Sequence, residues 1–297
     1  MNHLPNPQHM VTRFAPSPTG RLHIGHGWSA LQAMDMARDA GGEMRLRIED
    51  IDGTRSKPEH VEGIIEDLRW LGVQWDGLIV LQSRRLAEYQ GALDRLRDEG
   101  LVYPCFCTRA EIAAEIAASG SAPHGSEDAV YPGTCRHLSD DDRAQRLTSG
   151  ESHCWRLDMQ EAVNSAGELA WRDMDAGDVV AAPHLAGDVV LARKDAPSSY
   201  HLAATVDDAE MGITHVLRGD DLRTSTHIHR LLQALLDLPS PVYRFHPLLA
   251  DRHGKRLAKR SGSIALSQLR ENGVDPAQLR ADLRACRFPV GIHLLSA

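Results

Sequence analysis

The sequence predicts an α/β fold, and three observations indicate it. Short apolar segments alternate with helical patterns between residues 10 and 100. Clustered cysteines and a loop rich in Ser, Gly, Pro and Asp interrupt this alternation near residue 105, and the alternation resumes near residue 188. The order strand, helix, strand, helix is typical of a Rossmann-like sheet. We therefore predict four segments: the first half of a main domain (1–104), an inserted subdomain (105–187), the second half (188–240), and a basic loop with a short, mostly helical C-terminal region (241–297).

Composition narrows the classes of function. The chain has 297 residues, 42% of them hydrophobic and 25% charged, with a net charge of −8, so no global basic field favours non-specific binding of DNA or RNA. The first ten residues are polar and no apolar run is long enough to cross a bilayer, so we expect neither a signal peptide nor a membrane. Five cysteines, an odd number, favour a reducing cytoplasm and metal binding over disulfides.

The stretch from Phe14 to Gly27 predicts a phosphate site. It follows the start of an apolar strand and leads into a helical pattern, and its two prolines and Gly20 predict a turn. We expect the helix to begin near Gly25, where free N–H groups and the helix dipole suit a phosphate. His23 and His26 are three residues apart at that end and can donate to phosphate oxygens. A pair of histidines with no such role is the alternative interpretation.

Carboxylates follow the next predicted strand, Glu43–Ile48. The carboxyl end of a strand is where open α/β sheets bind ligands, so Glu49 is a candidate partner for an ammonium group. Asp50 and Asp52 are better explained as a solvated turn.

Two helices should follow and pack on the sheet. Ser56-Lys-Pro-Glu59 has the pattern of a capping box with proline at the first helical position. Apolar residues at helical spacing then form two stripes, the second ending at Gly100: Val61, Ile64, Ile65, Leu68 and Leu71, then Leu86, Tyr89, Leu93 and Leu96.

The inserted subdomain contains a predicted structural zinc site. Cys105, Cys107 and Cys135 lie in two short clusters that flank a predicted helix at residues 109–118. Three thiolates need a fourth ligand, and Tyr131 and His137 are the local candidates. Chemistry alone favours His137, because imidazole is the commoner zinc ligand. Cys154 and Cys286 stand alone in the sequence and are expected to be inert buried thiols.

The second half supplies a candidate anion-binding arginine. Residues 188–192 and 213–217 read as buried strands, a helix is expected soon after Pro197, and another spans residues 225–238. Arg218 directly follows the second strand, where it can bind an anionic group with two hydrogen bonds. A surface arginine paired with Asp220 or Asp221 is an equally open interpretation.

The C-terminal segment carries a basic loop between residues 248 and 262, bracketed by Gly254 and Gly262. Its Lys255 and Lys259 can neutralise phosphate charge if the loop closes over a triphosphate. Asp275 and Pro276 open one further helix.

Taken together, the motifs from Met10 to Ser263 resemble the glutamyl branch of class I aminoacyl-tRNA synthetases. The matching stretches are Arg-Phe-Ala-Pro-Ser-Pro-Thr-Gly (13–20), His-Ile-Gly-His (23–26), Arg-Ile-Glu-Asp (47–50), Val-Asp-Asp (206–208), Gly-Ile-Thr-His-Val-Leu-Arg-Gly-Asp-Asp (212–221) and the basic loop. The loop departs from the family's KMSKS pattern, because Ala258 replaces a serine.

The resemblance implies roles that the residues alone leave open. It implies that glutamate contacts Arg13, Phe14, Ala15, Pro16, Ser17, Glu49, Tyr200 and Arg218. It implies that ATP, with Mg²⁺, contacts His23, Gly25, His26 and Lys259, of which His23, His26 and Lys259 are the catalytic residues. It also implies zinc ligation by Cys105, Cys107, Tyr131 and Cys135, against the chemical preference for His137.

Length distinguishes members of this family. The chain ends at residue 297, soon after Arg260, whereas full synthetases continue into an anticodon-binding domain, so the sequence resembles the shortened glutamyl-queuosine tRNA(Asp) synthetases. That implies ATP-dependent activation of L-glutamate without tRNA, then transfer to the queuosine base of tRNA(Asp). The first alternative is a glutamyl-tRNA synthetase, or its catalytic half, that charges tRNA(Glu). The second is a regulator without catalysis, which Ala258 favours and the intact histidine pair opposes.

Overall fold

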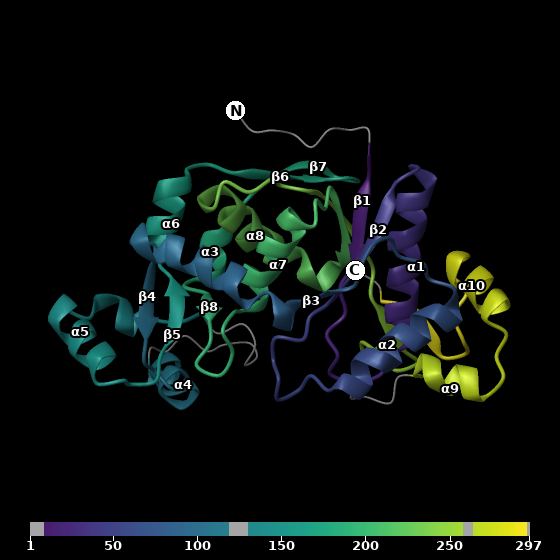
Figure 1. The fold of residues 1–297 in the computed structure, drawn as a ribbon, viewed down its shortest axis with the longest axis horizontal. Helices are drawn as coiled ribbons and strands as arrows, with labels where there is room; N and C mark the ends of the chain where they lie inside the picture. The colour runs from purple at the N-terminus through teal and green to yellow at the C-terminus, as the bar shows by residue number, and fades with distance from the viewer. Residues whose placement is uncertain (1–8, 119–129, 258–263, 296–297) are drawn as a thin grey trace.

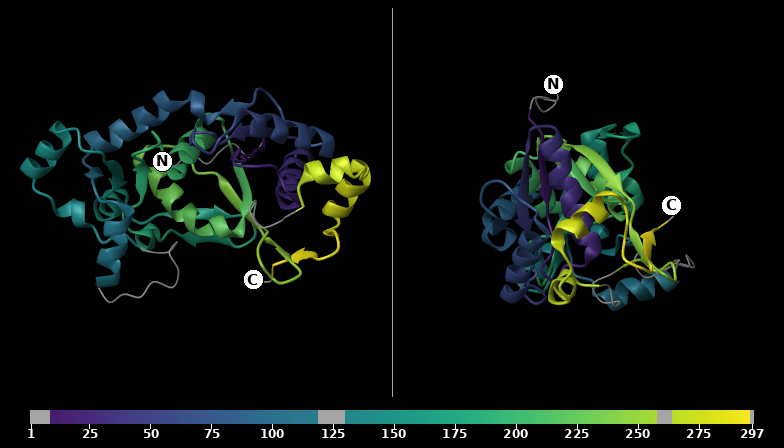
Figure 2. Two further views of the ribbon diagram at one scale, coloured as in Figure 1. Left: turned by 90° about the horizontal axis from the view of Figure 1, so that it is seen from below. Right: turned by 90° about the vertical axis from the view of Figure 1, so that its right-hand side faces the viewer.

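The computed structural model describes residues 9–118, 130–257 and 264–295. The molecule is elongated, with the main sheet near its middle, the insertion at one end and the C-terminal helices at the other (Figures 1 and 2). Lys259 and Ala258 of the basic loop lie outside the described residues.

The first half of the main domain is a parallel sheet with strand order β1-β2-β3. Its strands are β1 (Val11–Phe14), β2 (Glu43–Ile48) and β3 (Val80–Leu81), and its connecting helices are α1 (Ile24–Asp39) and α2 (Pro58–Leu71). The helix α3 (Leu86–Asp98) follows β3 after a 3₁₀ turn at Gln82–Arg84. The predicted strand–helix–strand–helix order is thus confirmed.

The second half continues beside β1. Strands β9 (His215–Gly219) and β10 (Val242–His246) are parallel, and the helices α7 (Tyr200–Glu210) and α8 (Arg223–Leu235) pack against each other. The amide of Thr214 donates to the carbonyl of Val11 at 2.9 Å, so β1 and β9 lie side by side. A parallel pairing with β6 (Ala170–Asp173), which forms a hairpin with β7 (Gly177–Val180), completes this sheet.

The insertion is built on an antiparallel sheet of order β4-β5-β8. Its strands are β4 (Val102–Cys105), β5 (Cys154–Leu157) and β8 (Val190–Ala192), and its helices are α4 (Arg109–Ala118), α5 (Asp140–Thr148) and α6 (Met159–Ala166). Short 3₁₀ turns at Thr134–His137 and Pro183–Ala186 connect these elements.

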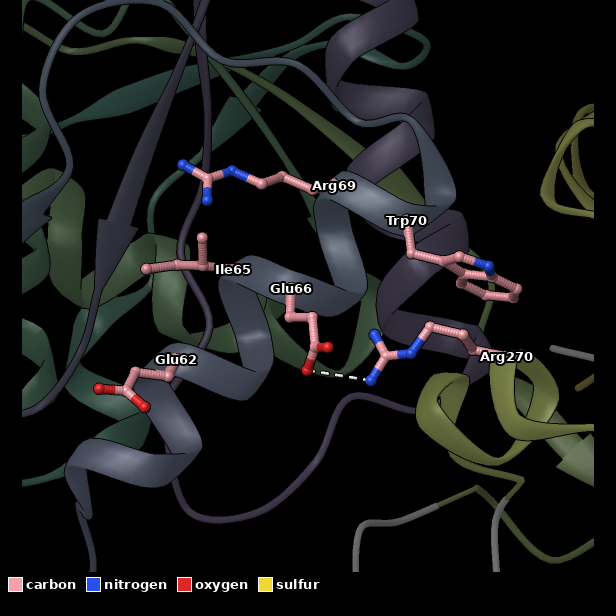
Figure 3. A pocket seen from close by; sticks show the side chains of 6 residues that line it. All are labelled: Glu62, Ile65, Glu66, Arg69, Trp70 and Arg270. Atoms are coloured by element: carbon pink, nitrogen blue, oxygen red, sulfur yellow. Dashed lines mark ion pairs between the residues drawn. The ribbon is translucent and has the colours of Figure 1, made fainter.

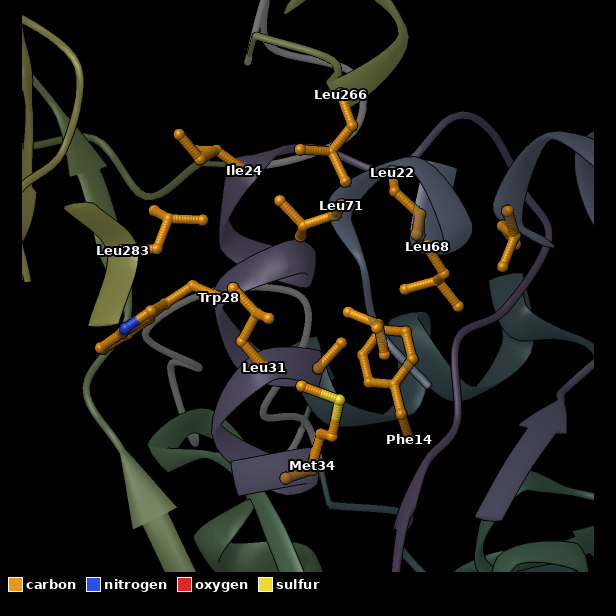
Figure 4. Packing of buried hydrophobic residues seen from close by; sticks show 14 of the residues in the cluster. Phe14, Leu22, Ile24, Trp28, Leu31, Met34, Leu68, Leu71, Leu266 and Leu283 are labelled. Atoms are coloured by element: carbon orange, nitrogen blue, oxygen red, sulfur yellow. The ribbon is translucent and has the colours of Figure 1, made fainter. Parts of the chain in front are cut away.

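The C-terminal region returns to α1. The strands β11 (Leu249–Asp251) and β12 (Ile292–Leu294) form an antiparallel pair, and the chain between them contains α9 (Leu266–Glu271) and α10 (Pro276–Arg284). Leu266 and Leu283 are fully buried and pack with Ile24, Trp28 and Leu71 around the first turns of α1 (Figure 4). Close packing here depends on Gly27, because a Cβ atom at that position would meet Leu71 Cδ2 at 2.8 Å.

Three local predictions need correction. The helix α2 has Lys57 as its N-cap with no side-chain hydrogen bond, so the predicted capping box at Ser56 is wrong, although Pro58 does open the helix. Leu86 is 39% exposed and leaves the apolar stripe of α3, because it stands at the first residue of the helix. The helix expected at residues 225–238 begins two residues earlier and ends at Leu235.

A buried cluster of charges joins the two halves of the main domain. Arg47 on β2 has no exposed side-chain area, and its Nη1 donates to Asp208 Oδ1 on α7 at 2.6 Å. Its Nη2 lies 3.1 Å from Glu49 Oε1 and its Nε 3.7 Å from Asp207 Oδ2. An ion pair sealed from water in this way is costly to break, because each partner is left as an uncompensated buried charge.

We therefore expect Arg47→Met to lower the free energy of unfolding by roughly 3–5 kcal/mol. The measurement is urea unfolding followed by circular dichroism. Arg45→Met on the same strand is the matched control, since Arg45 is one-third exposed and pairs with Glu43, and should cost less than about 1 kcal/mol. Equal losses in the two variants would contradict a special role for the buried cluster.

Candidate active site

A cavity of about 590 Å³ opens where β1, β2 and β9 end. The carboxyl edge of parallel strands is where this fold class binds ligands. Nine residues singled out from the sequence line the cavity: Arg13, Phe14, Ala15, Pro16, Ser17, His26, Glu49, Tyr200 and Arg218. The structure therefore brings the predicted glutamate-binding residues to one place.

The N-terminus of α1 is capped by its own histidines. His23 is the N-cap, and its Nδ1 accepts from the amide of Gly25 at 3.1 Å. In return, the Nδ1 of His26 accepts from the amide of His23 at 3.2 Å. Because Nδ1 is the acceptor in both rings, a ring proton belongs on Nε2, from where it can donate to a phosphate oxygen. Gly25 leaves room for this cap, since a Cβ atom there would lie 3.0 Å from the His23 ring and the ring would have to shift.

The chain after the basic loop is tied to this same helix end. The amide of Ile24 donates to the carbonyl of Ile264 at 3.3 Å, and the amide of Leu266 donates to the carbonyl of Leu22 at 2.9 Å. On the other side of the loop, Arg256 lines the cavity and pairs with Asp221 at 2.5 Å. The described residues on both sides of the loop are therefore anchored near the cavity, while the role of Lys259 stays a prediction.

Two of the candidate residues are already engaged with charges of the protein. Arg13 donates to Asp208 Oδ1 at 3.3 Å and to the carbonyl of Leu217 at 3.1 Å. Burial raises the pKa of Asp208, but the guanidinium groups of Arg13 and Arg47 outweigh it and hold that pKa below its ordinary value. Glu49 is paired with Arg47, and burial raises the pKa of its carboxyl group above the ordinary value. A further cation bound beside Glu49 would stabilise its charged form.

Arg218 differs from both, because its described partners are neutral. It is 4% exposed, and its Nη1 lies 3.4 Å from Tyr200 Oη and 3.3 Å from His229 Nδ1. Nη2 donates to Thr226, and the rings of Tyr243 and Phe245 lie 5.2 and 5.8 Å from the guanidinium carbon. Its buried Nε has no acceptor within the described ranges.

The alternative of a surface ion pair for Arg218 is therefore wrong. Asp220 pairs with Arg223, and Asp221 pairs with Arg256. Arg218 is a buried cation at the wall of a cavity without a carboxylate partner among the described residues. Such a group is suited to an anionic ligand.

The cysteine cluster fits a zinc ion. The Sγ atoms of Cys105, Cys107 and Cys135 all lie within 4.8 Å of one another, with 3.4 Å between Cys107 and Cys135. Tetrahedral coordination with Zn–S distances of about 2.3 Å places two sulfurs roughly 3.8 Å apart, so little movement is needed. Tyr131 Oη lies 3.5 Å from Cys107 Sγ, whereas the His137 side chain is part of an exposed residue that is absent from the thiol cluster. The donor set thus favours Tyr131 over His137.

Cys154 is not isolated, contrary to the sequence interpretation. It lies directly opposite Cys105 in the β4–β5 pairing and is buried. Its thiol donates to Cys105 and lowers the pKa of Cys105, so Cys105 is the thiol of the pair that ionises first. Strand pairing between residues 49 positions apart is not visible in cysteine spacing, which explains the error. The expected burial is confirmed for Cys154 and wrong for Cys286, which is exposed.

Comparison with known proteins gives the family. Residues 9–291 match the family model described as the catalytic domain of class I tRNA synthetases (E and Q). The chain belongs to this family. It is therefore a ligase of the class I aminoacyl-tRNA synthetase type, and the α/β fold class predicted from the sequence is confirmed.

Individual relatives are close over most of the chain. The glutamyl-Q tRNA(Asp) synthetase of Rhodobacter capsulatus is 47% identical and covers 91% of this chain, which in turn covers 98% of that protein. The protein of the same name from Symbiobacterium thermophilum is 45% identical, covering 89% of this chain and 82% of its own length. The solved glutamate-tRNA synthetase of Elizabethkingia anophelis superposes with a TM-score of 0.78 at 27% identity, over 94% of this chain and 61% of that one.

Sequence reasoning assigned no role to several residues of this synthetase that the structure brings to the site. Asp207 and Asp208 hold Arg13 and Arg47, and Gln82 and Tyr89 both donate to Asp207. A usable signal was present, since two adjacent carboxylates on the apolar helix α7 must find cations when they are buried. Arg55 and Arg193 also line the cavity, but their exposed loops carry no pattern that predicts this.

A second groove lies away from this cavity, on the outer side of α2 (Figure 3). Glu66 and Arg270 form an ion pair of 2.9 Å across it, with Trp70 beside them. It contains none of the candidate residues. Separately, none of the helices within the described ranges has both the length and the apolar character to span a membrane.

We expect zinc binding by this synthetase to depend on Cys135 and Tyr131. Cys135→Ser should lose the metal, and Tyr131→Phe should bind it more weakly by at least the roughly 10–100-fold that removing an outer-shell partner costs. Zinc content after dialysis and limited proteolysis of the insertion are the measurements. His137→Ala and Cys286→Ser are the controls, since both residues are exposed. Loss of zinc in His137→Ala with retention in Tyr131→Phe would reverse the assignment.

Proposed function

We propose that this synthetase activates L-glutamate with ATP in the absence of tRNA, then transfers the glutamyl group to the queuosine base of tRNA(Asp). One observation carries the first part. A single cavity is lined both by Arg218, a buried cation without a described carboxylate partner, and by His26 at the N-terminus of α1. A site with an amino-acid carboxylate at one end and a phosphate at the other matches these two groups.

The proposed binding mode gives each group of glutamate a partner. The side-chain carboxylate accepts from Arg218 and from the hydroxyl of Tyr200, and the ammonium group lies beside Glu49. The backbone from Arg13 to Ser17 forms the adjacent wall, leaving the α-carboxylate on the side of His26. Arg13 is less suited to the side-chain carboxylate, because Asp208 already compensates its charge.

The reaction then needs positioning and charge stabilisation rather than a protein nucleophile. An oxygen of the α-carboxylate attacks the α-phosphorus of ATP, the bond to the bridging oxygen breaks, and pyrophosphate leaves with that electron pair. The Nε2–H groups of His23 and His26 donate to phosphate oxygens, and Lys259 is proposed to bind the departing phosphates. Mg²⁺ arrives with ATP and spreads the negative charge of its phosphates.

Two features support activation without tRNA and transfer to queuosine. The cavity wall is held by contacts within the chain, including Arg47 with Asp208, so no tRNA group is needed to complete the amino-acid pocket. The names of the Rhodobacter and Symbiobacterium relatives support tRNA(Asp) as the acceptor. The alternative, charging of tRNA(Glu), is favoured by a 40% identical glutamate–tRNA ligase of Dinoroseobacter shibae, which this chain covers over 59% of its length.

We expect the purified protein to exchange pyrophosphate into ATP when glutamate is present and tRNA is not. Labelled glutamate should then appear on tRNA(Asp) that contains queuosine and not on tRNA(Asp) that lacks it. Removing the 3′-terminal nucleotide is the control, since it prevents charging of the terminal ribose and leaves the modified base intact. Label on tRNA(Glu) would favour the alternative, and a protein without exchange activity would support loss of catalysis.

We expect Arg218→Lys to raise the KM for glutamate at least tenfold, and Arg218→Ala to raise it further. A lysine keeps the charge but cannot offer two parallel hydrogen bonds to a carboxylate. The KM for ATP should change less than about twofold, which pyrophosphate exchange measures in the same assay. Arg244→Ala on the neighbouring strand β10 is the control, since Arg244 is largely exposed and pairs with Asp175. A wild-type glutamate KM in Arg218→Ala would transfer the role to Arg13.

A further inference from the structure

Arg218, His229 and His201 form a row of side chains in hydrogen-bond contact. His229 on α8 is 2% exposed, and its Nδ1 lies 3.3 Å from Arg218 Nη1. Its other nitrogen, Nε2, lies 3.3 Å from Nδ1 of His201 on α7. The row guanidinium, imidazole, imidazole therefore crosses from β9 to α8 to α7.

The hydrogen-bond chemistry fixes the direction of this row. A guanidinium can only donate, so Nδ1 of His229 must be an acceptor and the proton of the neutral ring sits on Nε2. That Nε2–H donates to Nδ1 of His201, which places the proton of His201 on its own Nε2 as well. Burial, with the charge of Arg218, lowers the pKa of His201 to about 4 and that of His229 well below its ordinary value. Both rings are therefore neutral near pH 7, and His229 accepts from Arg218 while His201 accepts from His229.

Because its hydrogen-bond partners are neutral, Arg218 keeps its positive charge at the cavity wall, which a carboxylate partner would cancel. Tyr200, Thr226 and His229 hold the guanidinium in place without cancelling its charge. In contrast, the other buried arginines at this site, Arg13 and Arg47, both face Asp208. Arg218 is thus oriented by the protein but left to be neutralised by a ligand.

We propose that His229, supported by His201, is a positioning residue that orients Arg218 and thereby lets the enzyme select glutamate over glutamine. The inference rests on the proposed function, in which Arg218 binds the side-chain carboxylate of glutamate. Glutamine presents an amide of the same shape, whose NH₂ group cannot accept from a guanidinium. Selection between the two amino acids therefore requires the plane of Arg218 to be fixed, since a guanidinium free to rotate could meet the amide oxygen alone.

The test compares three variants at position 229. His229→Gln retains an acceptor for Arg218 and a donor for His201, and should keep the glutamate KM within about threefold. His229→Leu removes the acceptor, and should raise the glutamate KM at least tenfold and narrow the preference for glutamate over glutamine, with kcat and the KM for ATP nearly unchanged. His229→Asp adds a carboxylate that neutralises Arg218, and should raise the KM for glutamate more than the other two substitutions.

Two controls separate positioning from general damage. His227→Leu removes another histidine of α8, one bonded to Trp171 and to the amide of Ala182, and should leave the glutamate KM unchanged. Long-range ¹⁵N–¹H NMR of the wild-type protein should show His229 as the neutral ring with its proton on Nε2. This spectrum does not depend on the folding of any variant.

The outcomes are distinguishable. Absence of glutamate-dependent exchange in the wild-type protein would overturn the proposed function and this inference with it. Normal exchange in the wild type together with an unchanged glutamate KM and selectivity in folded His229→Leu would overturn the inference alone. Equal losses in the Gln and Leu variants, or an NMR spectrum with the proton on Nδ1 of His229, would also overturn it.

Discussion

The ion cluster around Arg47 is the constraint on which the rest of the site depends. One guanidinium with no exposed area holds Glu49, just after the end of its own strand, and Asp207 and Asp208 on α7, 160 residues away in the chain. Asp207 in turn accepts from Gln82, Arg85 and Tyr89. Because these charges are buried, separating them would leave each one without water or a counter-charge. The pairs therefore fix how the two halves of the main domain pack against each other. The positions of Glu49 and Arg13 at the cavity follow from that packing.

Charge compensation also decides what the cavity can bind. The charges of Arg13 and Arg47 are neutralised by carboxylates of the protein, so these side chains form part of the wall and need no anionic ligand. Arg218 lies at the same wall and forms no ion pair with a carboxylate among the described residues, and its Nε is buried without an acceptor there. The three arginines therefore differ in their partners, although all three carry the same guanidinium group.

Local signals in the sequence could predict much of this arrangement. The turn before Gly25 and the carboxylate after β2 lie where strand and helix ends were expected, because each depends on neighbouring residues, while the strand expected at residues 213–217 is shifted by two, so that Arg218 lies near its end rather than after it. Contacts between distant residues could not be predicted in this way. The pairs Arg47–Asp208 and Cys105–Cys154, and the row from Arg218 to His201, arise only when strands and helices are assembled. The capping box at Ser56 is a local pattern that was nevertheless wrong, because the helix has Lys57 rather than Ser56 as its N-cap.

The insertion is connected to the cavity through its sheet, which gives the cysteine cluster an influence beyond its own subdomain. Cys105 ends β4, β4 pairs with β5, and β5 pairs with β8, whose first residue, Val190, lines the cavity. The ammonium group of Lys194, just after β8, donates to the carbonyl of Phe106 between the two cysteines of the first cluster, at 2.8 Å. A metal bound to Cys105 and Cys107 would thereby also hold the loop carrying Arg193 against the cavity. The cysteine cluster of the insertion and the wall of the cavity are thus parts of one packed structure.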